Sequence, residues 1–340
     1  MIWLTWRQFR TQALAVAAFL LLFVLALALT WSQVTSLARD TGFSGCQADA
    51  CDDAADAFLG ALSNETAGRL YYAGIAVLFV LPALLGLFWG APLVARELES
   101  GTYRLIFSQS VSRRRWLLVK LGVGVLAAAL GAGLASLAVS QWAAPIDQAG
   151  SRVSPVTFAT RGIVPIGYAA LAFVIGVVVG MVLRRTLAAM AVTLLVVVAV
   201  QVAVPLALLP LVAKPQTTVM ALDPSEGFIY RVDPATNEMH LDAGSDLPGA
   251  WIQERSTVTS TGAEFKAKTD PATCGPLNPS NHGPSPECRE WLATQNLSVK
   301  LTYVPGSSFW SLQWRQFGVL MALTLGLSWF SLWWIRRRLA

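Results

Sequence analysis

The stretch R-E-L-E-S-G-T-Y-R-L-I-F-S-Q-S-V-S-R-R-R-W-L-L-V-K, residues 96–120, decides how the rest of the chain can fold. It holds six Lys or Arg and only two acids, and a long apolar run lies on each side of it. A loop this short between two membrane spans cannot build a core of its own. Because short loops rich in Lys and Arg stay in the cytoplasm, the stretch predicts a loop that faces the cytoplasm.

The composition is that of a membrane protein. A mean hydropathy of +0.54, with 55% hydrophobic and 13% charged residues, excludes an ordinary soluble domain. Crossing a bilayer takes roughly 20 apolar residues. Six segments meet that length: Leu14–Trp31, Leu70–Val94, Leu117–Val139, Ile163–Leu183, Thr186–Ala213 and Phe317–Ile335. We expect the second to tilt or kink at Pro82 or Pro92, and the fifth to leave the bilayer near Pro205 or Pro210.

The distribution of charge predicts the orientation. If both termini, the 95–116 loop with Lys120 and the Arg184-Arg185 turn share one side, that side holds 13 Lys/Arg and 2 acids. The other side then holds 12 Lys/Arg and 18 acids. Both termini are therefore predicted to be cytoplasmic. The pI near 9.2 follows from this topology and does not indicate nucleic-acid binding. Five Lys against twenty Arg, with abundant Ala, points to a bacterium with a GC-rich genome.

The predicted fold class is an all-α polytopic membrane protein with six transmembrane helices and a small mixed extracytoplasmic domain. Its regions are an interfacial amphipathic helix at 1–12, a five-span region at 13–213, the extracytoplasmic domain at 214–315, and a sixth span with a basic tail at 316–340. A cleaved signal peptide is the alternative for the N-terminus. An apolar stretch of 18 residues exceeds the usual length of about 7–15, which favours an uncleaved span.

Local patterns predict structure outside the spans. In the outer loop 32–69, Phe58, Leu59 and Leu62 indicate one amphipathic helix. The 214–315 domain contains two β-favouring runs, Phe228–Val232 and 297–304. Such runs alternate there with turns rich in Pro, Gly, Asn and Asp.

All four cysteines fall on the acid-rich side. Cys46 and Cys51 lie in the first outer loop, and Cys274 and Cys288 lie in the 214–315 domain. This placement suits two local disulfides in an oxidising compartment, although four cysteines allow three pairings and unpaired thiols are the alternative. A zinc site at Cys274, His282 and Cys288 would lack a fourth ligand, so no metal is expected.

Inside the spans, small and polar residues stand out. Gly86/Gly90 and Gly176/Gly180 form small-x-x-x-small pairs, which let helices approach closely, and packing within the chain is favoured over a dimer seam. Gln201, near the middle of the fifth span, either contacts a substrate or bonds a neighbouring helix, and the second is favoured. No charge lies at mid-membrane, which disfavours an ion-driven carrier and suits an apolar or lipid-like substrate better.

The basic loop itself has a pattern. Residues 100–102, Ser-Gly-Thr, predict a turn followed by a helix start, because Gly frees the backbone and Thr can cap the next amides. Tyr103, Ile106 and Phe107 then lie on one helical face with Arg104 beside it. This predicts a short amphipathic helix parallel to the membrane.

The end of the loop leads into the third span. Ser112 is the expected N-cap, the arginines at 113–115 are expected at the headgroups, and Lys120 is expected to snorkel back towards them. Glu97 and Glu99 gain nothing from anionic lipid, so we expect them to pair with arginines of this chain or of a partner.

The run A-R-E-L-E-S-G-T-Y-R-L, followed by S-x-S-R-R-R-W-L-L-V-K, resembles the first cytoplasmic loop of ABC type-2 exporter permeases. There, an E-x-E-x-G-T element leads into a coupling helix, and Ser-Arg begins the third span. The matching residues are Glu97, Glu99, Gly101, Thr102, Leu105, Ser112, Arg113 and Lys120. The six-span layout is similar too, but the last outer segment is larger than in the simpler members, so their substrates do not transfer.

The resemblance implies a permease subunit of an ATP-driven exporter in a bacterial plasma membrane. Two permease subunits, identical or different, would pair, and separate cytosolic ABC ATPases would bind ATP-Mg. The implied ATPase-coupling residues are Glu97, Glu99, Gly101, Thr102, Tyr103, Arg104 and Phe107. This chain has no G-x-x-x-x-G-K-[ST] loop and no catalytic constellation, so it is not expected to be an enzyme or to hold a cofactor. The alternative is a non-transporting sensor or scaffold that acts through its extracytoplasmic domain.

Overall fold

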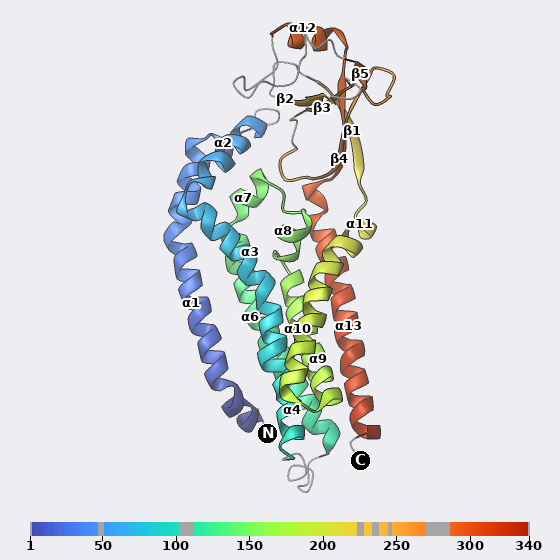
Figure 1. The fold of residues 1–340 in the computed structure, drawn as a ribbon. Coiled ribbons are helices and arrows are strands. Elements are labelled where there is room, and N and C mark those ends of the chain that lie inside the picture. The colour runs from blue at the N-terminus through green and yellow to red at the C-terminus, as the bar shows by residue number, and fades with distance from the viewer. Residues whose placement is uncertain are drawn as a thin grey trace.

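The computed structural model describes residues 2–46, 51–101, 112–222, 228–232, 238–243, 247–268 and 286–338. Within them, six segments are long and apolar enough to span a membrane, which confirms the predicted six-span fold. The spans are Leu14–Asp40, Thr66–Glu99, Arg113–Trp142, Val164–Leu183, Thr186–Val212 and Gly306–Arg337. They run side by side in one bundle, with the strands gathered at one end and the start of α1 and the end of α13 at the other (Figure 1).

The spans contain most of the helices, and two spans are interrupted. The helices are α1 (Ile2–Asp40), α2 (Cys51–Ser63), α3 (Thr66–Leu85), α4 (Ala91–Glu99), α6 (Arg113–Trp142), α7 (Ala144–Ala149), α8 (Pro155–Ala159), α9 (Val164–Leu183), α10 (Thr186–Ala203), α11 (Leu209–Val212), α12 (Pro286–Thr294) and α13 (Phe309–Arg338). A π-helical turn at Gly86–Gly90 joins α3 to α4, and another at Val204–Leu208 joins α10 to α11. The first lies between the predicted kink sites Pro82 and Pro92, and the second contains Pro205.

The first helix differs from its prediction. Helix α1 is continuous from Ile2 to Asp40, so the predicted interfacial helix 1–12 and the first span form one helix. The place of residues 2–12 at the membrane interface stays a prediction.

Helix α9 lies at the centre of the bundle because it is apolar on every face. It contacts α3, α4, α6, α10 and α13. Glycines make the closest approach: a Cβ on Gly86 would lie 2.7 Å from the carbonyl oxygen of Ala172, and one on Gly176 would lie 2.7 Å from the backbone nitrogen of Ala91. The predicted packing of these glycines within the chain is confirmed. We call this contact between α9 and the α3–α4 span the glycine seam.

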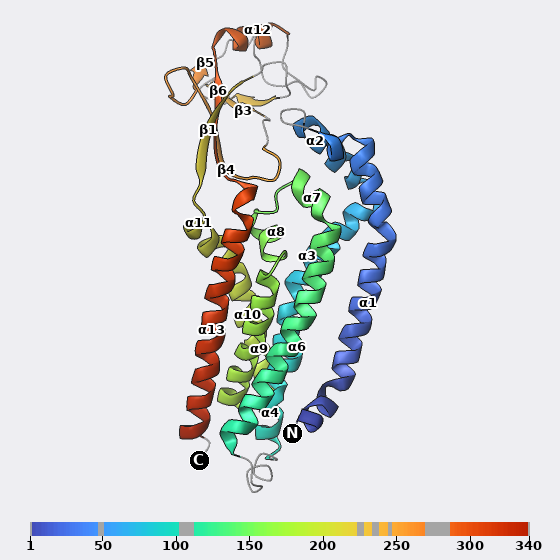
Figure 2. The ribbon, with the colours of Figure 1, turned by 180° about the vertical axis from the view of Figure 1, so that it is seen from behind.

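The strands form a domain rooted on the fifth and sixth spans, here called the β domain. Its strands are β1 (Gln216–Ala221), β2 (Phe228–Val232), β3 (Glu238–Ala243), β4 (Trp251–Val258), β5 (Ala267–Lys268) and β6 (Ser298–Val304). They pair in two antiparallel three-stranded sheets, β1-β6-β4 and β2-β3-β5. β1 follows α11, and β6 leads through a short 3-10 turn into α13 (Figure 2). Strands β2 and β6 confirm the two predicted β runs.

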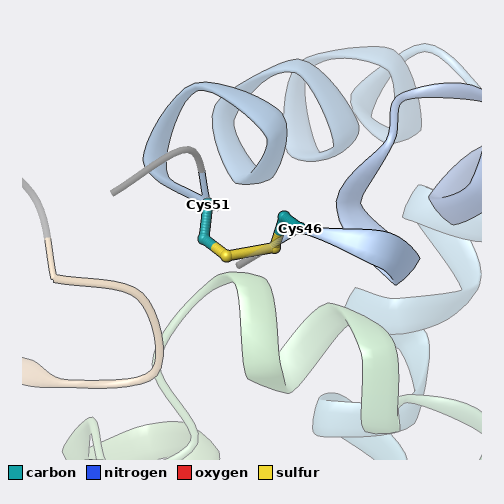
Figure 3. The surroundings of a disulfide bond; sticks show 2 residues. All are labelled: Cys46 and Cys51. Carbon is teal, nitrogen blue, oxygen red and sulfur yellow. A yellow bond between two sulfur atoms is a disulfide. The ribbon is translucent and has the colours of Figure 1, made fainter. Parts of the chain in front are cut away.

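The first outer loop also follows its prediction. Helix α2 buries Ala55, Phe58 and Leu62, as expected of an amphipathic helix. Cys46 and Cys51 form a disulfide at its start (Figure 3). Cys288 is also disulfide-bonded, and Cys274 lies outside the described residues.

Candidate functional site

Two polar clusters lie at opposite ends of the bundle, and the first holds the start of the basic loop. Glu97 on α4 forms an ion pair with Lys120 on α6, and Lys120 Nζ also donates to the Leu93 carbonyl oxygen at 3.3 Å. The Lys120 side chain is 6% exposed and that of Glu97 is 14% exposed. The prediction that Lys120 snorkels to the headgroups is therefore wrong. A buried carboxylate nearby stabilises the ammonium inside the bundle better than an extended route to the surface.

Glu99, also on α4, links that helix to α10. Its Oε2 accepts hydrogen bonds from the backbone nitrogen of Thr186 at 2.9 Å and from the Thr186 hydroxyl at 2.6 Å. Thr186 is the first residue of α10, whose first amides have no partner within the helix. Glu99 thus caps α10 from another span, at the end of the helix dipole that favours a negative charge.

The loop turns immediately after these two acids. Gly101 has a φ of 71°, a left-handed conformation that glycine adopts without strain, so the predicted turn is confirmed. Where the chain rejoins the bundle, the Ser112 hydroxyl accepts a hydrogen bond from the backbone nitrogen of Arg115 at 3.4 Å, which confirms the predicted N-cap of α6. The remaining predicted coupling residues, Thr102, Tyr103, Arg104 and Phe107, lie outside the described residues.

The second cluster lies at the β-domain end, on residues that the sequence did not single out. Arg161 forms an ion pair with Asp147 of α7, with its Nε 2.7 Å from Oδ2 and its Nη2 3.3 Å from Oδ1. The Tyr71 hydroxyl donates to Asp147 Oδ1 at 2.8 Å, and the guanidinium lies 5.2 Å from the Tyr71 ring centre. Arg161 is 1% exposed and Asp147 5% exposed, so each depends on the other for stabilisation.

The chain between this ion pair and α9 is held by two further helices. Gly162 adopts a φ of 64°, its carbonyl accepts from the Ser136 hydroxyl at 2.7 Å, and its amide donates to the Ser140 hydroxyl at 3.2 Å. Both serines belong to α6. From α13, Gln313 Oε1 accepts hydrogen bonds at 3.0 Å from the amides of residues 163 and 164. The start of α9 is therefore fixed by α6 and α13 together.

A groove opens beside this junction, between α6 and the start of α13, and we call it the α6–α13 groove. Its volume is about 620 Å³. It is lined by Leu126, Ala129, Leu130, Gly133, Leu134, Leu137, Ser140, Gln141, Ala144, Asp147, Gln148, Arg152, Arg161, Gly162, Ile163, Ile166, Phe309 and Trp310. The lining is apolar along α6 and polar at the β-domain end.

Gln201 lies elsewhere. It is buried on α10, and its Nε2 donates a hydrogen bond to the carbonyl oxygen of Phe79 on α3. The favoured alternative, a bond to a neighbouring helix, is confirmed, and its contact with a substrate stays a prediction. Within the described part of the chain, no group of three or more His, Cys, Asp or Glu side chains could hold a metal ion.

The fold and these sites define a multi-pass membrane protein whose loops at one end are short and braced, and which carries a β domain at the other end. Residues 17–208 match the family described as ABC-2 membrane transporter related, and the chain belongs to that family. It is therefore an ABC-2 type permease component, a class that is typically a non-catalytic membrane subunit. The match covers the first five spans with the basic loop and leaves out the β domain. Comparison with curated proteins and with solved structures gave no match.

Proposed function

We propose that this chain is the permease subunit of an ATP-driven exporter, and that a separate cytosolic ABC ATPase docks on loop 95–116. The observation that carries the proposal is the bracing of that loop by two carboxylates. Glu97 joins α4 to α6, and Glu99 joins α4 to α10, so a push on the loop acts on three spans at once. A loop that only connected two spans would not need ties to a third.

In this proposal the residues of the loop divide their roles. Tyr103, Arg104 and Phe107, preceded by Thr102, contact the ATPase, whereas Glu97, Glu99 and Gly101 hold the loop in place. ATP-Mg is bound by the ATPase and supplies the energy. Docking needs to favour one form of the bundle over another by only a few kcal/mol to shift their populations.

The proposal also includes the number of permease subunits, the membrane and the orientation. Two permease subunits, identical or different, pair in a bacterial plasma membrane, with both termini and loop 95–116 in the cytoplasm. The scarcity of charge inside the spans favours an apolar or lipid-like substrate.

Docking is tested by purification in mild detergent with the ATPase encoded beside this gene. Wild-type protein should retain the ATPase in stoichiometric amount. The double variant Tyr103→Ala/Phe107→Ala should lose it, and Trp310→Ala, an exposed aromatic at the opposite end, should keep it. Retention by the double variant would refute docking on this loop. Failure of the wild type to retain any ATPase would favour the sensor or scaffold alternative, for which the β domain beyond the family match is the motivating feature.

Topology is tested by cysteine labelling. An impermeant maleimide should label Arg114→Cys only after the membrane is opened, whereas Thr261→Cys, on an exposed turn of the β domain, should be labelled in intact cells. Labelling of Arg114→Cys from outside would overturn both the orientation and the docking proposal.

A further inference from the structure

The α6–α13 groove has the length of one bilayer leaflet. At the helical rise per residue, the α6 segment from Leu126 to Gln141 is about 22 Å long. Half a bilayer, from its midplane through the headgroup region, is about 20–22 Å thick. A groove of this length is long enough to reach from the middle of the membrane to one surface.

Tryptophans on α13 place the polar end of the groove at that surface. Exposed Trp310 and Trp314 lie near the start of α13, and exposed Trp329 and Trp333 lie near its end. Tryptophan is enriched at both membrane–water interfaces, so these two pairs mark the two headgroup levels. Trp310 lines the polar end of the groove, so this end of the groove lies at headgroup depth on the β-domain side.

One cation at this polar end stands apart from the buried ion pair. Of the three charged residues that line the groove, Asp147 and Arg161 neutralise each other, which leaves Arg152. Arg152 donates one hydrogen bond, from Nη2 to the Gly306 carbonyl oxygen at 3.0 Å, and its guanidinium lies 5.0 Å from the Phe309 ring centre. Within the described residues no carboxylate pairs with it. A half-buried guanidinium with unused donors is suited to a phosphate group.

The lining of the groove favours a lipid over a protein helix as the occupant. The groove holds about 620 Å³, which is within the range of small-molecule sites. The cation Arg152 lies at its polar end, where a phospholipid presents a phosphate and a transmembrane helix presents none. An elongated amphiphile fits both the shape and the separation of apolar from cationic lining.

We propose that the α6–α13 groove binds an anionic phospholipid from the leaflet on the β-domain side. An acyl chain lies along Leu130 and Leu134 on α6, and the phosphate accepts hydrogen bonds from Arg152, with Gln141 and Gln148 beside it. This site is independent of ATPase docking, so it can be tested on the permease chain alone.

A pair of matched substitutions tests the groove. Ala129 lines it, whereas Ala127, two residues away on α6, is exposed and does not. The full-length chain in mild detergent is given phosphatidylglycerol or phosphatidylcholine of the same acyl chains, and bound lipid is counted by native mass spectrometry. We expect Ala129→Trp to retain phosphatidylglycerol about tenfold less than wild type, and Ala127→Trp to retain it as wild type does. Equal retention by the two variants would overturn the site.

Substitutions of the cation test the headgroup. Wild type should retain phosphatidylglycerol about tenfold better than phosphatidylcholine. This ratio corresponds to the free energy of one charge-assisted hydrogen bond. Arg152→Lys should keep that preference and Arg152→Gln should lose it, with melting temperatures measured alongside to show that both variants fold. No preference in the wild type, or a protein chain retained in place of the lipid, would refute an anionic phospholipid as the occupant.

Discussion

Replacing Lys120 with Met should destabilise the bundle by about 3 kcal/mol. Removing one partner of a buried ion pair costs about 3–5 kcal/mol, because the other charge stays in a low-dielectric environment. We expect the lower end of that range because the Glu97 side chain is 14% exposed, so water still stabilises part of its charge. The substitution also removes the bond to the Leu93 carbonyl oxygen and the ammonium 4.5 Å from the Trp116 ring centre.

The assay is reversible unfolding in mixed detergent micelles, followed by tryptophan fluorescence. The matched control is Arg114→Met, which removes the same charge from the same helix at an exposed position. That variant should stay within about 0.5 kcal/mol of wild type, as surface substitutions usually do. The double variant Lys120→Met/Glu97→Met should recover most of the loss, because an apolar pair of similar volume replaces the buried charges.

Two results would refute this reasoning. If Lys120→Met unfolds like Arg114→Met, the ion pair does not stabilise the bundle. If the double variant is as unstable as the single one, the buried Glu97 carboxylate left without Lys120 is not the cause. The double variant also separates the two roles of Glu97. A stable double variant that still retains the ATPase shows that Glu97 only holds the loop, whereas one that loses the ATPase shows that its carboxylate contacts the partner.

Three further predictions concern the glycine seam, the Asp147–Arg161 pair and the disulfide. Gly176→Ala should cost about 1–3 kcal/mol, because its Cβ would lie 2.7 Å from a backbone nitrogen of α4. Gly131→Ala, with no described atom within 4 Å of its Cβ, should cost nothing, and equal unfolding curves for the two would contradict the glycine seam. Arg161→Leu should cost about 3–5 kcal/mol, because Asp147 stays buried without its cation; an unchanged melting temperature in detergent would show that the pair does not support folding. Cys51→Ser should destabilise the first outer loop by about 2 kcal/mol, from loop closure, seen as faster proteolysis between α1 and α2. Cleavage at the wild-type rate would count against this.

The spans could be predicted from the sequence because bilayer thickness imposes a length that hydropathy measures directly. The ends of the spans could not. Helix α1 runs to Asp40, beyond the predicted end at Trp31, because a helix can continue in water where hydropathy no longer reports on it. The glycine seam was predictable for a similar reason: the spacing of small residues along one helix shows which face can approach a neighbour.

The polar contacts show where sequence reasoning stops. The sequence predicts the wrong place for Lys120 because its partner Glu97 lies in another helix, and spacing along the chain does not reveal such a pair. The Asp147–Arg161 pair was not predicted, because no helical or strand spacing links two residues 14 positions apart. A signal was present: Arg161 adjoins a span on the acid-rich side, where an arginine has no role in setting the orientation.

Helix α9 connects the two ends of the molecule. At one end its neighbour α4 carries both carboxylates that brace loop 95–116, and the glycine seam presses α4 and the π-helical turn before it onto α9. At the other end the start of α9 is fixed by α6 and α13, the helices that form the walls of the α6–α13 groove. Because atoms in the seam are already at close contact, α9 cannot absorb a displacement of α4 by compression. A shift of the loop must therefore either move α9 as a unit or open the seam. If α9 moves as a unit, the junction that borders the groove changes with it.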